Sequence, residues 1–198
     1  DREKGHLFIS DSNHNRILRI KMLTKTKGEI IEEIGGKDKG FEDGSYLEAK
    51  FLRPQGIVYN DNSLYICDTG NHAIREVDLI NKKVTTLISK EENFDLRSPW
   101  DLVCYGEIIY IAVAGSHKIC KFSLVTNTLT PLSGNGKENI VDGKSDFAQL
   151  AQPSGITTDG NEIYFADSEV SAIRSARIND GFVRTFIGRG LFVFGYKN

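Results

Sequence analysis

The chain has 198 residues, of which 39% are hydrophobic and 26% charged, and its formal net charge at pH 7 is −2. This composition is typical of a globular protein and argues against an intrinsically disordered chain. Nucleic-acid binders usually carry a basic excess that neutralises phosphates, so nucleic-acid binding is not expected here. No run of 18 apolar residues occurs, so we expect no membrane-spanning helix and no membrane partner.

The same strand–turn–strand unit is found four times along the chain. Its copies start at residues 7, 64, 109 and 163, so their starts lie 57, 45 and 54 residues apart. Each copy reads as a short apolar strand, a polar turn and a second strand, and the copies align without gaps: residues 7–17, 64–74, 109–119 and 163–173. This period is too long for leucine-rich or ankyrin repeats and suits a four-stranded blade with a loop of variable length.

Two further elements complete the repeat. A strand opened by a proline precedes three of the copies, at Pro54, Pro99 and Pro153. Proline has no N–H to donate, so the first position of a strand suits it. A fourth strand is predicted after every copy, at residues 28–34, 83–88, 127–132 and 181–187. The first copy lacks the proline-led strand, so the chain contains three complete blades and most of a fourth.

Several of these strands are apolar on both faces, as in residues 64–67 and 108–112. A sheet with one wet face should instead alternate polar and apolar residues. The pattern therefore predicts an all-β fold, a β-propeller of four-stranded antiparallel blades stacked around an axis. Residues 1–198 form one partial propeller, and the expected blade limits are 1–36, 37–92, 93–136 and 137–190. Residues 191–198 start the next connection, or Leu191 to Tyr196 fold back as a closing strand.

One repeat resembles a known family. The segment Asp68-Thr-Gly-Asn-His-Ala-Ile-Arg75, preceded by Pro54-Gln-Gly, resembles the NHL repeat. Two long connections also share a pattern, Asp43-Gly44…Ala49-Lys-Phe51…Pro54 and Asp142-Gly143…Ala148-Gln-Leu150…Pro153. The resemblance to NHL-repeat β-propellers covers nearly the whole chain. It implies a six-bladed ring, of which this chain supplies about four blades, in a parent that carries a thioredoxin-like domain before the propeller.

The candidate binding residues lie where loops should gather at one end of the propeller, around the mouth of its central channel. Loops held by a rigid scaffold often carry binding residues. Residues repeated in every blade more often stabilise the blade, and we interpret the turn aspartates Asp11, Asp68 and Asp167 and the prolines Pro54, Pro99 and Pro153 in that way. For His72 and His117 we also prefer the interpretation that they stabilise the blade. The candidates for partner binding are Arg53, Gln55, His72, Trp100, His117 and Gln152.

Trp100 and Arg53 stand out among these candidates. Trp100 occupies the position that holds Gln55 and Ser154 in the other blades, and Val113 replaces the repeated turn aspartate in the same blade. Tryptophan and arginine are favoured anchors of protein interfaces. An alternative role for Trp100 is to fill the wall of the channel.

Metal, cofactor and catalytic signals are weak. His14, His72 and His117 lie in different blades, and zinc would need three or four ligands at one point, so neither a metal nor another cofactor is expected. The acidic loop at residues 38–43 lacks the EF-hand order of ligands and is predicted to be a solvated turn. No nucleophile elbow, His-Glu-x-x-His or phosphate loop occurs. The cysteines of the apolar strands, Cys67 and Cys120, are expected to be buried and inert.

The three cysteines, which include Cys104, are too few for a disulfide framework and favour a reducing, cytoplasmic setting. The leading functional hypothesis is a non-catalytic scaffold that presents loops on one face to a protein or peptide partner. The family resemblance leaves two alternatives open, a metal-dependent lyase or hydrolase of the propeller type and an RNA-binding NHL domain. A partial ring also exposes blade faces and a strand edge, so self-association through them is expected.

Overall fold

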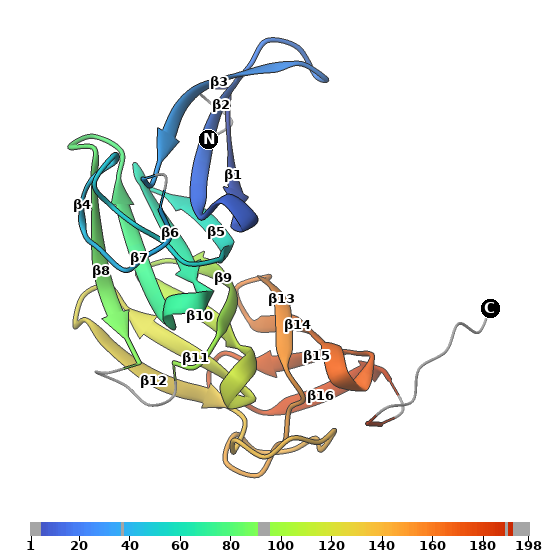
Figure 1. Ribbon diagram of the computed structural model, residues 1–198. Helices are drawn as coiled ribbons and strands as arrows, with labels where there is room; N and C mark the ends of the chain where they lie inside the picture. Colours follow the sequence, from blue (N-terminus) through green and yellow to red (C-terminus); the bar gives the residue numbers. More distant parts are fainter. Residues whose placement is uncertain (1–4, 37, 91–95, 189, 192–198) are drawn as a thin grey trace. The chain divides into compact units, whose positions relative to one another are not determined.

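The computed structural model describes residues 5–36, 38–90, 96–188 and 190–191, and Figure 1 shows their strands and short 3-10 turns. In these residues the strands form four antiparallel sheets, which confirms the predicted all-β class. The chain divides into two compact units, residues 1–89 and 90–198. No helix in the described ranges is long and apolar enough to cross a membrane. The expected closing strand, Leu191 to Tyr196, lies outside the described residues except for Leu191.

The first unit contains two sheets, here called blade 1 and blade 2. Blade 1 has three strands in the order β1-β2-β3, and over the described residues none of them opens with proline, as predicted. Blade 2 has the order β4-β8-β7-β6-β5, four sequential strands with a short additional strand at the outer edge. The elements of this unit are β1 (His6–Asp11), η1 (Ser12–His14), β2 (Arg16–Met22), β3 (Gly28–Ile34), β4 (Gly44–Ser45), β5 (Pro54–Asn60), β6 (Ser63–Asp68), η2 (Thr69–Asn71), β7 (Ala73–Asp78) and β8 (Lys83–Ser89).

The second unit contains blade 3 and blade 4, each with four strands in sequential order. The first strands of these two blades, β9 and β13, lie side by side. The elements of this unit are β9 (Pro99–Tyr105), β10 (Ile108–Val113), η3 (Ala114–Ser116), β11 (Lys118–Ser123), β12 (Thr128–Ser133), β13 (Pro153–Thr158), β14 (Glu162–Asp167), η4 (Ser168–Val170), β15 (Ala172–Arg177) and β16 (Val183–Ile187).

The polar turn of the repeat is a single 3-10 turn in all four blades. It closes with a residue in the left-handed region, where φ is 56° at Asn15, 54° at His72, 52° at His117 and 47° at Ser171. Non-glycine residues seldom adopt this conformation, and asparagine and histidine are among those that do so more often. The turn thus explains why Asn or His recurs at this place in three of the four copies.

The proline-led strand of each complete blade starts with a β-bulge. Pro54 pairs with Asp68 and Ile57 with Ile66, so β5 carries one residue more than β6 over this stretch. The same offset is present in β13, and in β9 the residue left without a partner is Trp100. A bulge interrupts the regular alternation of side chains and can turn one of them in a new direction.

Each unit has its own hydrophobic core between its two blades. In the first unit Ile17 and Ile34 of blade 1 pack with Leu64 and Val77 of blade 2. In the second unit the cluster includes Tyr110, Ala112 and Ile119 of blade 3 and Ile163, Phe165 and Val183 of blade 4. Strands β6 and β10 are buried at five consecutive positions, as their doubly apolar sequences predict.

Candidate functional site

The entry to each complete blade is the residue that precedes the strand-opening proline. Arg53, Ser98 and Gln152 all have positive φ there, at 52°, 50° and 60°. In both units a side chain of the preceding blade accepts a hydrogen bond from this residue's backbone N–H. Asn15 Oδ1 lies 2.9 Å from the Arg53 nitrogen, and His117 Nδ1 lies 3.3 Å from the Gln152 nitrogen. The left-handed residue that ends one blade's 3-10 turn therefore stabilises the left-handed entry of the next blade.

The hydrogen bond to His117 also indicates the tautomer of its neutral ring. A backbone N–H can only donate, so Nδ1 of His117 must accept, and the ring proton of the neutral imidazole lies on Nε2. The position is thus equivalent to Asn15, whose side-chain oxygen performs the same task.

The 3-10 turns hold the entry segments from the other side. Gly70 N–H donates to the Leu52 carbonyl at 2.8 Å, and Gly115 N–H donates to the Arg97 carbonyl at 3.0 Å. In blade 4 the Glu169 N–H makes the equivalent bond to Ala151 at 3.1 Å. In blades 2 and 4 the backbone at the entry is therefore hydrogen-bonded both to the preceding blade and to the blade's own 3-10 turn.

The six predicted partner-binding residues divide between the two units. Arg53 is exposed, Gln55 lies half-buried in the β5 bulge, and His72 ends the 3-10 turn of blade 2. In the second unit His117 and Gln152 are in contact, and the side chain of Trp100 is 41% exposed in the β9 bulge. The structure thus brings His117 and Gln152 together, whereas a single channel mouth that joins all six residues stays a prediction.

Asp101 is a candidate that sequence reasoning missed. It follows Trp100 at a position occupied by Gly56 and Gly155 in the other blades. Its Oδ2 accepts the N–H of Ile156 on the neighbouring strand β13 at 3.1 Å, and its Oδ1 accepts the N–H of Leu102 at 2.9 Å. Burial raises the pKa of this carboxyl above its usual value. The signal that could have found it is a carboxylate where the repeat has glycine.

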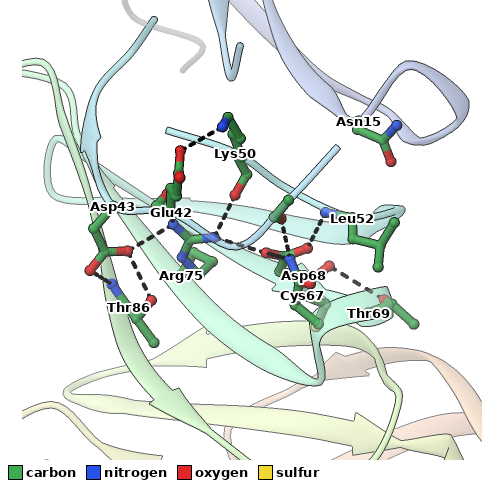
Figure 2. Close-up of polar contacts among 12 residues, drawn as sticks. Asn15, Glu42, Asp43, Lys50, Leu52, Cys67, Asp68, Thr69, Arg75 and Thr86 are labelled. Carbon is green, nitrogen blue, oxygen red and sulfur yellow. Dashed lines mark hydrogen bonds and ion pairs between the residues drawn. The ribbon is translucent and has the colours of Figure 1, made fainter. Parts of the chain in front are cut away.

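A buried arginine forms the polar centre of blade 2, as Figure 2 shows. The Arg75 side chain is fully buried and its Nη1 lies 2.8 Å from Asp68, which is also fully buried. Its Nη2 lies 2.8 Å from Asp43, and its two terminal nitrogens also donate to the backbone carbonyls of Glu42 at 2.6 Å and Lys50 at 3.0 Å. This one guanidinium therefore ties the connection of residues 42–50 to the blade.

The same centre is repeated in blade 4. Arg174 is fully buried, and its Nη1 lies 2.7 Å from Asp167 while its Nη2 lies 3.1 Å from Asp142. It also donates to the carbonyls of Gln149 at 2.7 Å and Val141 at 2.9 Å. The sequence signal was an aspartate followed seven residues later by arginine, which occurs in these two blades, whereas the corresponding pairs are Asp11 with Leu18 in blade 1 and Val113 with Cys120 in blade 3.

Both centres fix the segments that lead into the blade entries. Asp68 Oδ1 accepts the Leu52 N–H, and Asp167 Oδ1 accepts the Ala151 N–H, each at 2.8 Å. Burial raises the pKa of the Asp68 and Asp167 carboxyls, although the neighbouring arginines and hydrogen-bond donors act in the opposite direction. Each arginine thus has an architectural role, because it ties a connection to its blade.

The acidic connection of residues 38–43 was predicted to be a solvated turn, and one of its residues has interactions that the prediction did not include. It is largely exposed, but Asp43 is anchored by Arg75 and by the amide and hydroxyl of Thr86, both at 2.9 Å. The prediction missed this anchor because its partners lie 32 and 43 residues further along the chain.

The three cysteines are buried or half-buried. Cys67 and Cys120 are fully buried, and burial raises the pKa of the Cys104 thiol to about 12. The three cysteines form no disulfide in the described part of the chain. Over the same residues no group of three or more His, Cys, Asp or Glu side chains is placed to hold a metal ion.

Known structures share this architecture. The chain matches nidogen in a nidogen–laminin complex with a TM-score of 0.66 and 19% identity, over 94% of this chain and 63% of that one. It matches a virginiamycin B lyase from Staphylococcus aureus with a TM-score of 0.64 and 14% identity, over 93% of this chain and 52% of that one. Both are six-bladed propellers, and the likeness confirms the β-propeller fold.

Sequence comparisons identify the family. The NHL repeat profile matches residues 51–76, within blade 2 and the segment before it. The Arabidopsis thaliana protein SUPPRESSOR OF QUENCHING 1, chloroplastic, is 41% identical over 98% of this chain, and human NHL repeat-containing protein 2 is 32% identical over 98%. The chain spans 21% and 32% of the lengths of these two relatives. The repeated blades and these matches together show that the chain belongs to the NHL repeat family.

Proposed function

We propose that this NHL domain is a non-catalytic scaffold that binds a protein or peptide through the entry of blade 3. The observation that carries the proposal is the exposed Trp100, which stands in a β-bulge where the other complete blades have glutamine or serine. Residues that stabilise every blade are expected to recur, so a side chain that departs from the repeat and remains exposed is better suited to a partner.

The surroundings of Trp100 favour this role. Its strand is paired with β10 and lies beside β13, and the entry before it is held by the Gly115 and Ala114 amides, which donate to Arg97 and Ser98. A large aromatic side chain on such a rigid backbone loses little conformational entropy when a partner covers it. Trp and Arg are also enriched among the residues that dominate binding energy, and Arg53 gives the first unit an exposed arginine at the equivalent entry.

The test is selection of peptides from a random 12-residue phage library on the 198-residue chain, followed by affinity measurement on variants. We expect Trp100→Ala to weaken selected peptides at least about tenfold, a loss on the scale of a binding hot spot. Tyr105→Ala is the matched control, because Tyr105 is a 53% exposed aromatic residue at the other end of the same strand β9. Peptides that bind equally well to the wild type and to folded Trp100→Ala would contradict the proposal.

Self-association is a second proposal, supported by the outer face of blade 1. Leu7 and Ile9 alternate along β1 and are 45% and 38% exposed, and Ile30 of β3 is 52% exposed. The opposite face of β1 is occupied, because Phe8 stacks on Tyr59 of blade 2. We propose that a second copy covers the exposed face, and that Leu7→Glu with Ile9→Glu shifts the chain to monomer. Light scattering over a concentration series checks this, and a wild type that is already monomeric throughout would rule it out.

We propose an intracellular location, cytoplasmic as the cysteine content predicts. The Arabidopsis thaliana relative carries the word chloroplastic in its name, so the plastid is the competing compartment. Immunodetection in fractionated cells separates the two.

A further inference from the structure

We propose that Trp100 and Asp101 form a subsite for a cationic side chain, lysine or arginine, of the peptide or protein partner. This inference rests on the proposed function, because it names the chemistry that the entry of blade 3 would select. It is carried by a carboxylate that has no cationic partner among the described residues, an open space on the neighbouring strand and an exposed indole on the same bulge.

The Asp101 carboxylate has hydrogen-bonding capacity that its two backbone donors leave unused. Each of its oxygens accepts one backbone N–H, from Leu102 and Ile156, and a carboxylate can accept about four hydrogen bonds. Among the residues that the structure describes, no lysine, arginine or histidine forms an ion pair with it; the nearby Arg97 donates to Ser116 instead. Withdrawing a charge from water without a partner is costly, and burial accordingly raises the pKa of this group. A bound cation would remove that cost.

The neighbouring strand leaves room for a ligand. Gly155 is exposed, and a Cβ added to it would meet no heavy atom within 4 Å. Two glycines of the 3-10 turns are enclosed by comparison: a Cβ on Gly70 would lie 2.5 Å from Leu52, and one on Gly115 would lie 2.9 Å from the Arg97 carbonyl oxygen. Gly155 immediately precedes Ile156, whose N–H binds Asp101, so the open space lies one residue along β13 from that hydrogen bond.

Trp100 supplies the second attraction for a cation. Because the bulge interrupts the alternation of β9, Trp100 and the adjacent Asp101 are not forced to opposite faces of the sheet. The indole is the best aromatic partner for an ammonium or guanidinium group, which it attracts within about 6 Å of the ring. A carboxylate on the ligand would be repelled by Asp101, so the pair selects by charge.

The experiment uses the peptides selected on the chain and measures their affinities by fluorescence anisotropy. We expect them to contain a lysine or arginine whose replacement by norleucine or citrulline weakens binding to the wild type roughly tenfold. With Asp101→Asn the same replacement in the peptide should weaken binding less than about twofold, because this variant lacks the carboxylate that the basic residue would bind. Glu138→Gln is the control, since Glu138 is an exposed acid in the connection between blades 3 and 4.

Gly155→Val provides a second variant that leaves Asp101 intact and fills the open space. It is expected to weaken the basic peptides to a similar degree, and it keeps the test decisive if Asp101→Asn folds poorly. Peptides that need Trp100 but neither a basic residue nor Asp101 would overturn this inference and leave the proposed function standing. Selected peptides that are indifferent to Trp100→Ala would overturn both.

Discussion

The buried arginine centres of blades 2 and 4 have the same polar contacts but different apolar surroundings. In both, one guanidinium binds an interior aspartate, a connection aspartate and two backbone carbonyls, with distances between 2.6 and 3.1 Å. In blade 2 the guanidinium also lies over two aromatic rings, 5.1 Å from Phe41 and 5.0 Å from Phe51. The equivalent residues of blade 4 are Ile140 and Leu150, which offer no ring.

This difference separates what the repeat requires from what it tolerates. A buried charge needs every partner, so the donors and acceptors are the same in both blades. Apolar filling needs only the right volume, so phenylalanine and aliphatic residues exchange. Blade 3 has no Asp–Arg pair at these positions. Val113 and Cys120 replace the aspartate and the arginine, and both are fully buried. The connection of blade 3 also lacks the Asp-Gly pattern that the other two share.

Breaking either centre should have the largest effect on stability. Arg75→Ala or Arg174→Ala leaves a fully buried aspartate without its cation and two connection carbonyls without their donor. We expect each change to lower the free energy of unfolding at pH 7 by about 3–5 kcal/mol. Urea denaturation followed by circular dichroism measures this, and a loss below about 1 kcal/mol would show that the pair is dispensable.

Most of the fold could be predicted from the sequence, because strand length, turn position and repeat period are local patterns. The 3-10 turns and the starts of β5, β9 and β13 follow from such patterns, as does the missing strand of blade 1. The arginine centres are harder to predict from the sequence, because Arg75 binds Asp43, which lies 32 residues away in the chain. The only sequence signal for such a centre is the Asp-to-Arg spacing that blades 2 and 4 share. Asp101 is harder to predict for another reason: its hydrogen bond to Ile156 spans 55 residues, and a single carboxylate in a glycine position is a weak signal.

Replacing the Asp–Arg pair of blade 4 with the Val–Cys pair of blade 3 should recover part of the stability that Arg174→Cys alone loses. Arg174→Cys alone is expected to be strongly destabilising, whereas Asp167→Val with Arg174→Cys removes both charges and installs the pair found at Val113 and Cys120. We expect the double variant to be about 2 kcal/mol more stable than Arg174→Cys, an interaction typical of residues in one network. A double variant that is as unstable as the sum of the two single changes would show that the connection needs the arginine itself.

Exchanging the apolar surroundings should have a smaller effect. Phe51→Leu copies Leu150 of blade 4 and removes one of the two rings beside Arg75. We expect a loss of about 1 kcal/mol from the missing volume and ring interaction together. Phe41→Ile should cost less, because Phe41 is 45% exposed whereas Phe51 is fully buried. Equal losses at the two positions, measured by urea denaturation, would show that cation–π attraction rather than burial dominates.

The smallest expected effect concerns the charge of the connection aspartate. Burial raises the pKa of Asp43, but the hydrogen bonds from Thr86 and the charge of Arg75 outweigh it and hold that pKa below its usual value of 3.8. A carboxyl with a lowered folded-state pKa contributes stability above its unfolded pKa and loses it as the pH falls through the folded value. Asp43→Asn should therefore cost on the order of 1 kcal/mol or less from pH 7 to about 5, since Asp43 is partly exposed.

Below about pH 4 the stability difference between the wild type and Asp43→Asn should shrink, because protonation removes the charge that the variant already lacks. Thr86→Val removes the hydroxyl donor to Asp43 Oδ1 and should shift this loss toward higher pH, since one of the bonds that lowers the pKa is gone. Urea denaturation at pH 3 to 7 measures both effects. A difference that widens on acidification would have the wrong sign for a carboxylate stabilised in the folded state, and would show that burial rather than Arg75 and Thr86 controls its titration.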